Sequence, residues 1–128
     1  MKFLHSIVVL SALALGFPAR ADGPDYDNVL VLIRNGLKGS LTEQKRCVFH
    51  TTAADPTSGT VFNAGSLDVV ASAITASEVH FDCRKRQQCV TPEKGQPATF
   101  IRFAVLGNAL GLAGEISRLV EMCSGGGH

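Results

Sequence analysis

Two histidines, His50 and His80, are the side chains in this sequence best suited to acid–base chemistry. His50 follows Phe49 and His80 precedes Phe81, both in segments that read as strands. Two imidazoles near each other, with Arg84 to stabilise a phosphorane, would suit the cleavage of RNA. However, the two histidines show no characteristic spacing, and no catalytic carboxylate partner is evident. Histidines on the exposed faces of strands are therefore the simpler interpretation.

A second candidate is the basic cluster Arg84-Lys85-Arg86, which lies between Cys83 and Cys89. A disulfide across this polar excursion would hold three cations at the end of a loop, where they could contact an anionic partner. The alternative is a solvated hairpin end, whose charges keep a sheet from aggregating. Three charges make only a weak electrostatic surface, which favours the alternative.

The cysteines predict disulfides rather than a metal site or a nucleophile. An even number of cysteines in an exported chain is typical of disulfides, and four allow three pairings. We favour Cys83–Cys89, which would close the basic excursion, and Cys47–Cys123, which would tie a strand to the last helix. Five residues separate Cys83 from Cys89 and no Cys-x-x-Cys occurs, so a zinc site is not expected.

Other motifs of catalysis or cofactor binding are missing from the sequence. There is no Gly-x-Ser-x-Gly, and the glycine-rich run LGNALGLAG lacks both the Gly-Lys-Ser/Thr ending and the Gly-x-Gly-x-x-Gly spacing of phosphate-binding loops. We read that run as close packing of a helix on a sheet. No catalytic, cofactor-binding or metal-ligating residue is assigned, and no cofactor is expected.

The N-terminus has the pattern of a cleavable secretory signal at residues 1–21. Met1-Lys2 is a short basic start, an apolar run extends from Phe3 to Phe17, and Ala19 and Ala21 suit signal peptidase. The apolar run is shorter than the roughly 20 residues of a spanning helix. We therefore expect cleavage after Ala21 and a released product with no membrane anchor.

The expected mature chain, residues 22–128, has the size of one domain with a modest core. Loss of Lys2 and Arg20 reduces the 12 basic residues to 10 beside 11 acidic ones, a net charge of −1 with neutral histidines. This balance argues against a general polyanion binder. No specific nucleic-acid partner is expected. We expect a monomer.

Hydrophobic periodicity predicts the elements of that domain. Residues 22–28 read as a flexible arm, 53–65 as a loop, 84–98 as a polar excursion and 124–128 as a flexible tail. Strands are expected at 29–33, 44–52, 78–84 and 99–105, and helices at 66–77 and 109–123. Residues 29–33 could also be part of a buried helix, because a short apolar run fits both.

These elements predict an α+β fold in two layers. An antiparallel sheet of about four strands would be covered on one face by two helices and stapled by two disulfides. Along the last two predicted strands, Val79, Phe81 and Cys83, then Ile101, Phe103 and Val105, should face the core.

The signal at 1–21, the small mature domain and Cys47, Cys83, Cys89 and Cys123 together resemble the small secreted cysteine-containing effectors of plant-associated fungi. The mixture of strands and helices is similar to their killer-toxin-like α/β-sandwich subset, a four-stranded antiparallel sheet with two helices on one face. The element order expected here differs from that of the subset. The resemblance implies a virulence-type protein that binds host targets or evades detection, without catalysis.

Three functional readings follow. The first is a secreted, non-enzymatic effector that binds an unknown protein or anionic target, outside the producing cell or in a host. The second is a small secreted ribonuclease-like hydrolase using His50 and His80. The third is a bacterial periplasmic or secreted protein with a structural or inhibitory role.

Overall fold

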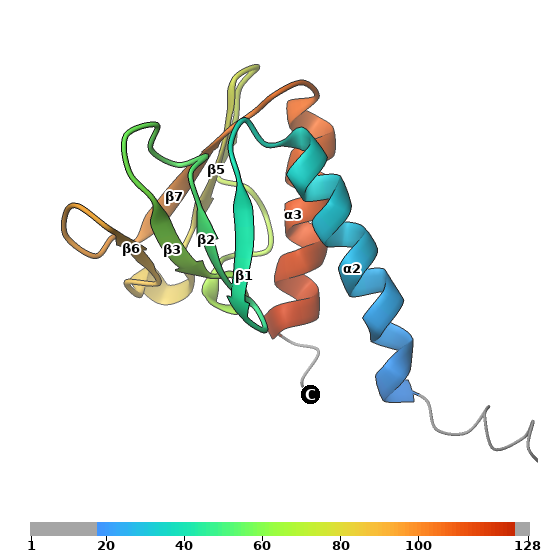
Figure 1. The fold of residues 1–128 in the computed structure, drawn as a ribbon. Coiled ribbons are helices and arrows are strands. Elements are labelled where there is room, and N and C mark those ends of the chain that lie inside the picture. Colours follow the sequence, from blue (N-terminus) through green and yellow to red (C-terminus); the bar gives the residue numbers. More distant parts are fainter. Residues whose placement is uncertain (1–17, 125–128) are drawn as a thin grey trace, which may run out of the picture.

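The computed structural model describes residues 18–124, and it has the expected α+β architecture. Helices α2 (Pro18–Gly36) and α3 (Ala109–Ser124) pack side by side, next to the strands (Figure 1). One antiparallel sheet has the strand order β1-β2-β3-β6, and a second has the order β4-β5-β7. The strands are β1 (Leu41–Lys45), β2 (Val48–Thr51), β3 (Thr60–Asn63), β4 (Ala73–Ile74), β5 (Glu78–Asp82), β6 (Val90–Pro92) and β7 (Phe100–Ala104).

The first helix corrects two predictions. Residues 22–28 are not a loose arm and 29–33 are not a strand, because both belong to α2. Its buried side chains recur at helical spacing and begin before the apolar run: they are Tyr26, Val29, Leu30 and Ile33, followed by Leu37 just after the helix. Val31 and Leu32, inside the apolar run, are about half exposed. A strand buried on both faces would have hidden them.

The segment predicted as one strand at 44–52 is a hairpin, and two further strands were missed. Cys47 has a φ of 70° and lies at the turn between β1 and β2. β3 falls in the predicted loop 53–65 and pairs with both β2 and β6. β6 falls in the polar excursion 84–98. These strands are three or four residues long, too short for a clear alternating pattern.

The prediction of a helix at 66–77 is wrong. A short 3₁₀ turn, η1 (Ala64–Ser66), is followed by extended chain that runs beside β5. The backbone N–H groups of Asp68, Ser72 and Thr75 donate to carbonyls of 82, 80 and 78. Val70, an apolar residue near the start of the predicted helix, is 71% exposed. Pairing along β5 satisfies this backbone and leaves the β-branched side chains at the surface.

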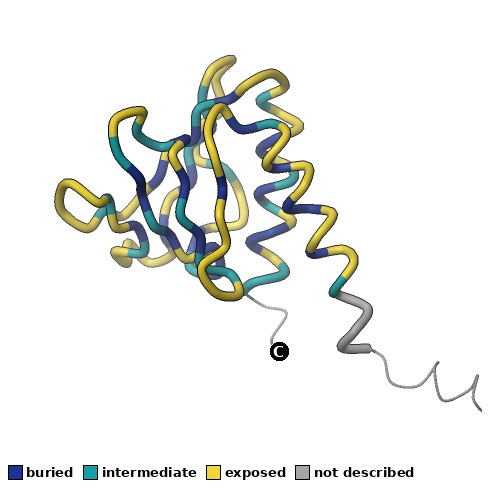
Figure 2. The backbone as a smooth tube through the Cα atoms, in the orientation of Figure 1, coloured by how far each residue is buried: buried dark blue, intermediate teal, exposed yellow. Residues whose placement is uncertain are grey.

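The last three predicted elements are confirmed. β5 buries Val79 and Phe81, and β7 buries Ile101 and Phe103. α3 buries the apolar stripe Leu112, Ile116, Leu119 and Val120. Buried positions recur at intervals between exposed ones along both helices, as Figure 2 shows.

Phenylalanine rings join the inner faces of the two sheets. Phe62 of β3 packs on Phe49 of β2, with ring centroids 5.6 Å apart. Phe62 also meets Phe103 of β7 edge-on at 5.3 Å, and Phe103 meets Phe81 at 6.4 Å. The two sheets therefore enclose one core, to which α2 and α3 contribute their buried faces.

The cysteines pair as the sequence analysis favoured. Cys47 bonds Cys123 across a separation of 76 residues, and Cys83 bonds Cys89 across a separation of 6. Two disulfides are typical of proteins in an oxidising compartment. Within residues 18–124, no helix has the length and apolar character needed to cross a membrane.

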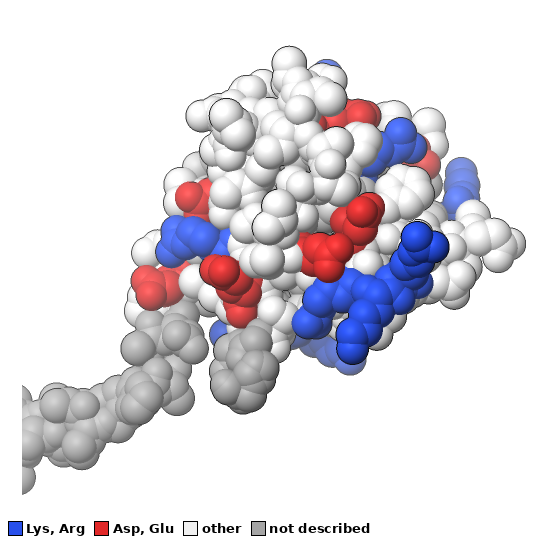
Figure 3. All heavy atoms as spheres, turned by 180° about the vertical axis from the view of Figure 1, so that it is seen from behind, with Lys and Arg blue, Asp and Glu red and all other residues white. Residues whose placement is uncertain are grey.

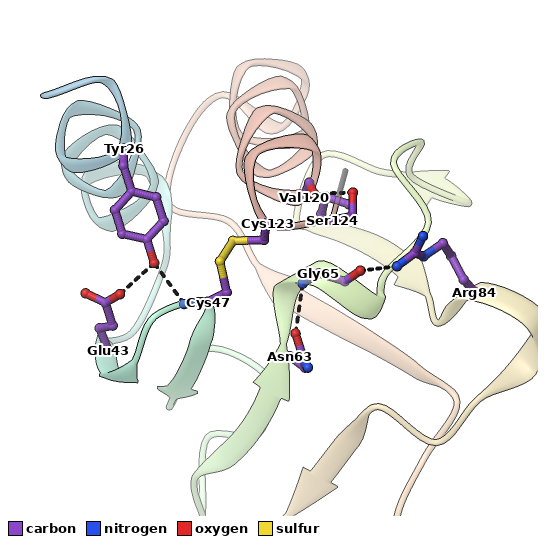
Figure 4. The surroundings of a disulfide bond; sticks show 9 residues. All are labelled: Tyr26, Glu43, Cys47, Asn63, Gly65, Arg84, Val120, Cys123 and Ser124. Carbon is purple, nitrogen blue, oxygen red and sulfur yellow. Dashed lines mark hydrogen bonds between the residues drawn. A yellow bond between two sulfur atoms is a disulfide. The ribbon is translucent and has the colours of Figure 1, made fainter. Parts of the chain in front are cut away.

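The first disulfide lies in a cluster of polar contacts around Tyr26 (Figure 4). The Tyr26 hydroxyl donates to the Glu43 carboxylate at 2.6 Å and accepts from the Cys47 N–H at 3.0 Å. The Arg46 guanidinium covers the Tyr26 ring at 4.0 Å from its centroid. α2 is thereby attached to the β1–β2 hairpin at the turn that carries the disulfide.

On the other side of this disulfide, Gly65 packs directly on the last turn of α3. A Cβ at Gly65 would lie 2.6 Å from the carbonyl oxygen of Cys123, too close for any other residue. The Asn63 side chain accepts from the Gly65 N–H at 2.9 Å and fixes the start of η1.

The two disulfides give a direct mass test. Each removes two hydrogens, so the oxidised protein should have four fewer hydrogens than its reduced form. Intact mass before and after reduction measures this. Denatured, non-reduced protein should take up no alkylating reagent, and any alkylated thiol would contradict the two-bridge structure.

Tyr26 provides a second test, since it is the single tyrosine of the chain. Burial, and then the hydrogen bond to Glu43, raise the pKa of Tyr26 from 10.0 to about 12. The folded state therefore favours the protonated phenol. This stabilisation is complete below pH 10 and is lost as the pH rises towards 12.

Near-ultraviolet absorbance reports the tyrosinate directly. The folded protein should titrate near 12 and the denatured protein near 10. The variant Glu43→Gln should titrate lower than the wild type, because it loses the carboxylate charge. A wild-type midpoint near 10 would mean that Tyr26 does not make these contacts.

Candidate functional site

The most distinctive exposed segment is the loop closed by Cys83–Cys89, which we call the basic tip (residues 83–89). It begins with the 3₁₀ turn η2 (Arg84–Arg86), in which Lys85 and Arg86 have φ angles of 54° and 56°. Residues other than glycine seldom adopt this left-handed conformation. The short disulfide loop reverses the chain within a few residues, and Lys85 and Arg86 adopt the positive φ angles that this turn requires. The conformation presents both side chains to solvent.

Arg84 behaves differently from the other two cations of the cluster. Its guanidinium donates to the carbonyl oxygen of Gly65, the residue that packs on Cys123 (Figure 4). All three cations of the cluster are at exposed positions. In the structure Arg84 anchors the basic tip to η1, while Lys85 and Arg86 line a neighbouring depression.

This depression, which we call the charged groove, has a volume of about 420 Å³. Its walls carry two cations, two carboxylates and an aromatic ring, from Lys85, Arg86, Asp68, Asp82 and Phe100, and it is completed by Cys83 and Thr99. Figure 3, which shows the back of the molecule, has a patch of Lys and Arg side chains directly beside carboxylates.

Backbone pairing explains why the groove residues lie together. Asp82 and Phe100 are directly opposed on β5 and β7, so their side chains share the outer face of the sheet. On the other side of β5, the Asp68 N–H donates to the Asp82 carbonyl at 2.8 Å. The three residues therefore form a row across the end of the sheet where β5 leads into the basic tip.

The charged side chains of the groove form no salt bridges with other described residues. Among the described residues, the salt bridges are His50–Glu93, His80–Glu78 and Arg118–Glu115, and none includes a groove residue. Asp82 accepts one weak hydrogen bond from Ser72, at 3.4 Å. The cations and carboxylates of the groove thus face solvent without partners of opposite charge in residues 18–124.

His50 lies on the outer face of the four-stranded sheet and pairs with a glutamate. Its Nε2 is 3.0 Å from Glu93 Oε2, and the other carboxylate oxygen accepts from the Gly59 N–H at 2.9 Å. The Gly59 hydrogen bond, and then the one from His50, hold the pKa of Glu93 below its usual value. A side chain at Gly59 would collide with the imidazole, so this glycine permits the pair.

His80 lies on the outer face of the other sheet and has its own carboxylate. Its Nε2 is 3.1 Å from Glu78 Oε1, and Arg102 is opposite it on β7. The neighbours of each histidine along its strand point into the shared core. The two imidazoles therefore point outward from opposite sides of that core, and the fold does not bring them together.

Several site residues were missed by the sequence analysis. Glu93 and Glu78 are the carboxylate partners that the sequence does not reveal, and the groove residues Asp68 and Phe100 were not among the candidate site residues. Alternation in the strand 78–84 did place Asp82 outward with His80. Asp68 was assigned to the first turn of a helix that does not exist, which hid its place beside β5.

No metal centre is formed within residues 18–124, where His, Cys, Asp and Glu side chains do not gather in threes. Comparison of the chain with protein-family models, curated proteins and solved structures gives no match.

Proposed function

We propose that this chain is a secreted, non-enzymatic binding protein of the effector or virulence type, which recognises a host or extracellular target through the basic tip. The observation that carries the proposal is the presentation of Lys85 and Arg86. Both are exposed, neither is in a salt bridge of the described residues, and Cys83–Cys89 fixes the loop that holds them.

Rigidity supports a role in recognition. A loop that is already ordered loses less conformational entropy on binding, so more of the contact energy appears as affinity. The basic tip is held at its ends by a disulfide and along its length by the contact of Arg84 with Gly65. A solvated hairpin end would need neither constraint.

The alternative is a ribonuclease-like hydrolase using His50 and His80. General acid and general base must both lie within hydrogen-bond reach of one substrate. The opposite orientation of the two imidazoles does not favour such a joint site. Pairing with Glu93 gives His50 a local role in attaching β2 to the segment after β6, whereas His80 pairs with Glu78 of its own strand.

A charge-removal experiment tests the proposal. The variant Lys85→Ala/Arg86→Ala should fold normally and lose binding to the target, because these side chains make no contacts that hold the core. The loss should be greatest at low salt, since exposed charges are screened within roughly 10 Å at 0.1 M ionic strength. Arg84 is left in place because it anchors the tip.

The matched control is Lys38→Ala/Lys94→Ala, which removes the same charge from exposed positions outside the groove. The three proteins would be immobilised and exposed to extracellular fluid from host tissue, and the retained proteins quantified by mass spectrometry. A target should be retained by the wild type and the control and lost with the tip variant. Equal retention by all three would exclude the basic tip.

The same preparations test the absence of catalysis. Purified, oxidised wild-type protein should leave RNA intact. Robust degradation that disappears in His50→Ala or His80→Ala would overturn the non-enzymatic proposal.

A further inference from the structure

The charged groove indicates which class of partner the basic tip would bind, provided that the tip is a binding surface as proposed above. Four exposed charges of both signs line one depression, together with Phe100, which is 44% exposed. Surface charges usually pair with neighbours or stand apart in solvent. Here the cations and the carboxylates face the same space without pairing with each other.

Polyanions fit this arrangement poorly. A phosphate backbone, a sulfated polysaccharide or an anionic lipid surface that contacts Lys85 and Arg86 would bring its own charges close to Asp68 and Asp82. Like charges brought together at an interface oppose binding and discriminate against the wrong partner. The carboxylates in the groove therefore select against the ligands that the two cations alone would attract.

The row of residues across the sheet also determines the length of a segment that could bind there. Asp68, Asp82 and Phe100 occupy neighbouring chain segments, and two inter-strand steps of about 4.8 Å each span roughly 10 Å. An extended peptide advances about 3.3 Å per residue, so about three residues cover this distance. The cations stand beside the middle of the row, where β5 enters the basic tip.

We propose that the charged groove binds a short, extended polypeptide segment that carries both an acidic and a basic side chain. The acidic side chain pairs with Lys85 and Arg86, and the basic side chain pairs with Asp68 and Asp82. An apolar side chain of the same segment contacts the Phe100 ring. Only a polypeptide, among the common classes of macromolecule, offers all three within a few residues.

A random peptide library displayed on phage provides a probe that needs no knowledge of the natural target. The library would be selected on the oxidised wild type, on Lys85→Ala/Arg86→Ala, on Asp68→Asn/Asp82→Asn and on the control Lys38→Ala/Lys94→Ala. Asparagine keeps the shape of aspartate and an acceptor for Ser72. Circular dichroism and the Tyr26 titration would confirm that each variant is folded.

Wild type and control should enrich peptides with acidic and basic residues a few positions apart. The asparagine variant should lose the preference for basic residues, and the alanine variant the preference for acidic ones. A synthetic peptide of the enriched sequence should bind either variant about tenfold more weakly than wild type, the loss expected for two exposed ion pairs. Wild type should elute from immobilised heparin at low salt, and the asparagine variant at higher salt.

The outcomes separate the two proposals. Enrichment of purely acidic peptides, with no change in the asparagine variant, would overturn the mixed-charge partner and leave binding by the basic tip intact. Tight retention of wild type on heparin, unaffected by the asparagine changes, would also overturn the mixed-charge partner. It would indicate that the basic tip binds a polyanion. Enriched peptides that bind all four proteins equally would overturn both the groove and the basic tip.

Discussion

The bond between Cys47 and Cys123 is the constraint on which the rest of the structure depends. It joins the turn of the first hairpin to the last turn of α3, two segments that are distant in sequence. Tyr26 attaches α2 to the same turn, and Gly65 places η1 against the same helix end. A chain of this size has a modest core, so a covalent closure at the meeting point of four segments contributes much of the fixed geometry.

This closure extends to the surface through Arg84. Gly65 lies between Cys123 and the Arg84 guanidinium, so the base of the basic tip rests on the segment that packs against the first disulfide (Figure 4). The second disulfide then closes the tip itself. The direction in which Lys85 and Arg86 point is thus determined by contacts in the body of the protein.

The hydrophobic pattern of a segment predicted its structure correctly where one face of the element meets the core and the other meets water. β5, β7 and α3 satisfy this condition, and Phe81 and Phe103, which were expected to face the core, are buried. The hydrophobic pattern failed for α2 because the apolar run 29–33 covers only part of the helix, although Tyr26 and Leu37 continue the helical period of that run. It failed again at Val70, where an accidental helical spacing lies on an exposed edge. The charged groove depends on which segments pair with β5, and that pairing is a long-range property that no single segment encodes.

The separation of Cys47 from Cys123 has a consequence for biosynthesis. A chain is made from its N-terminus, so Cys47 is synthesised well before Cys123. The first thiols that Cys47 can meet are those of Cys83 and Cys89, which belong to each other. Premature bonds of this kind are corrected by thiolate attack through mixed disulfides. Formation of the native pairs therefore depends on thiol–disulfide exchange that continues after Cys123 has been made, and conditions that slow this exchange favour scrambled isomers.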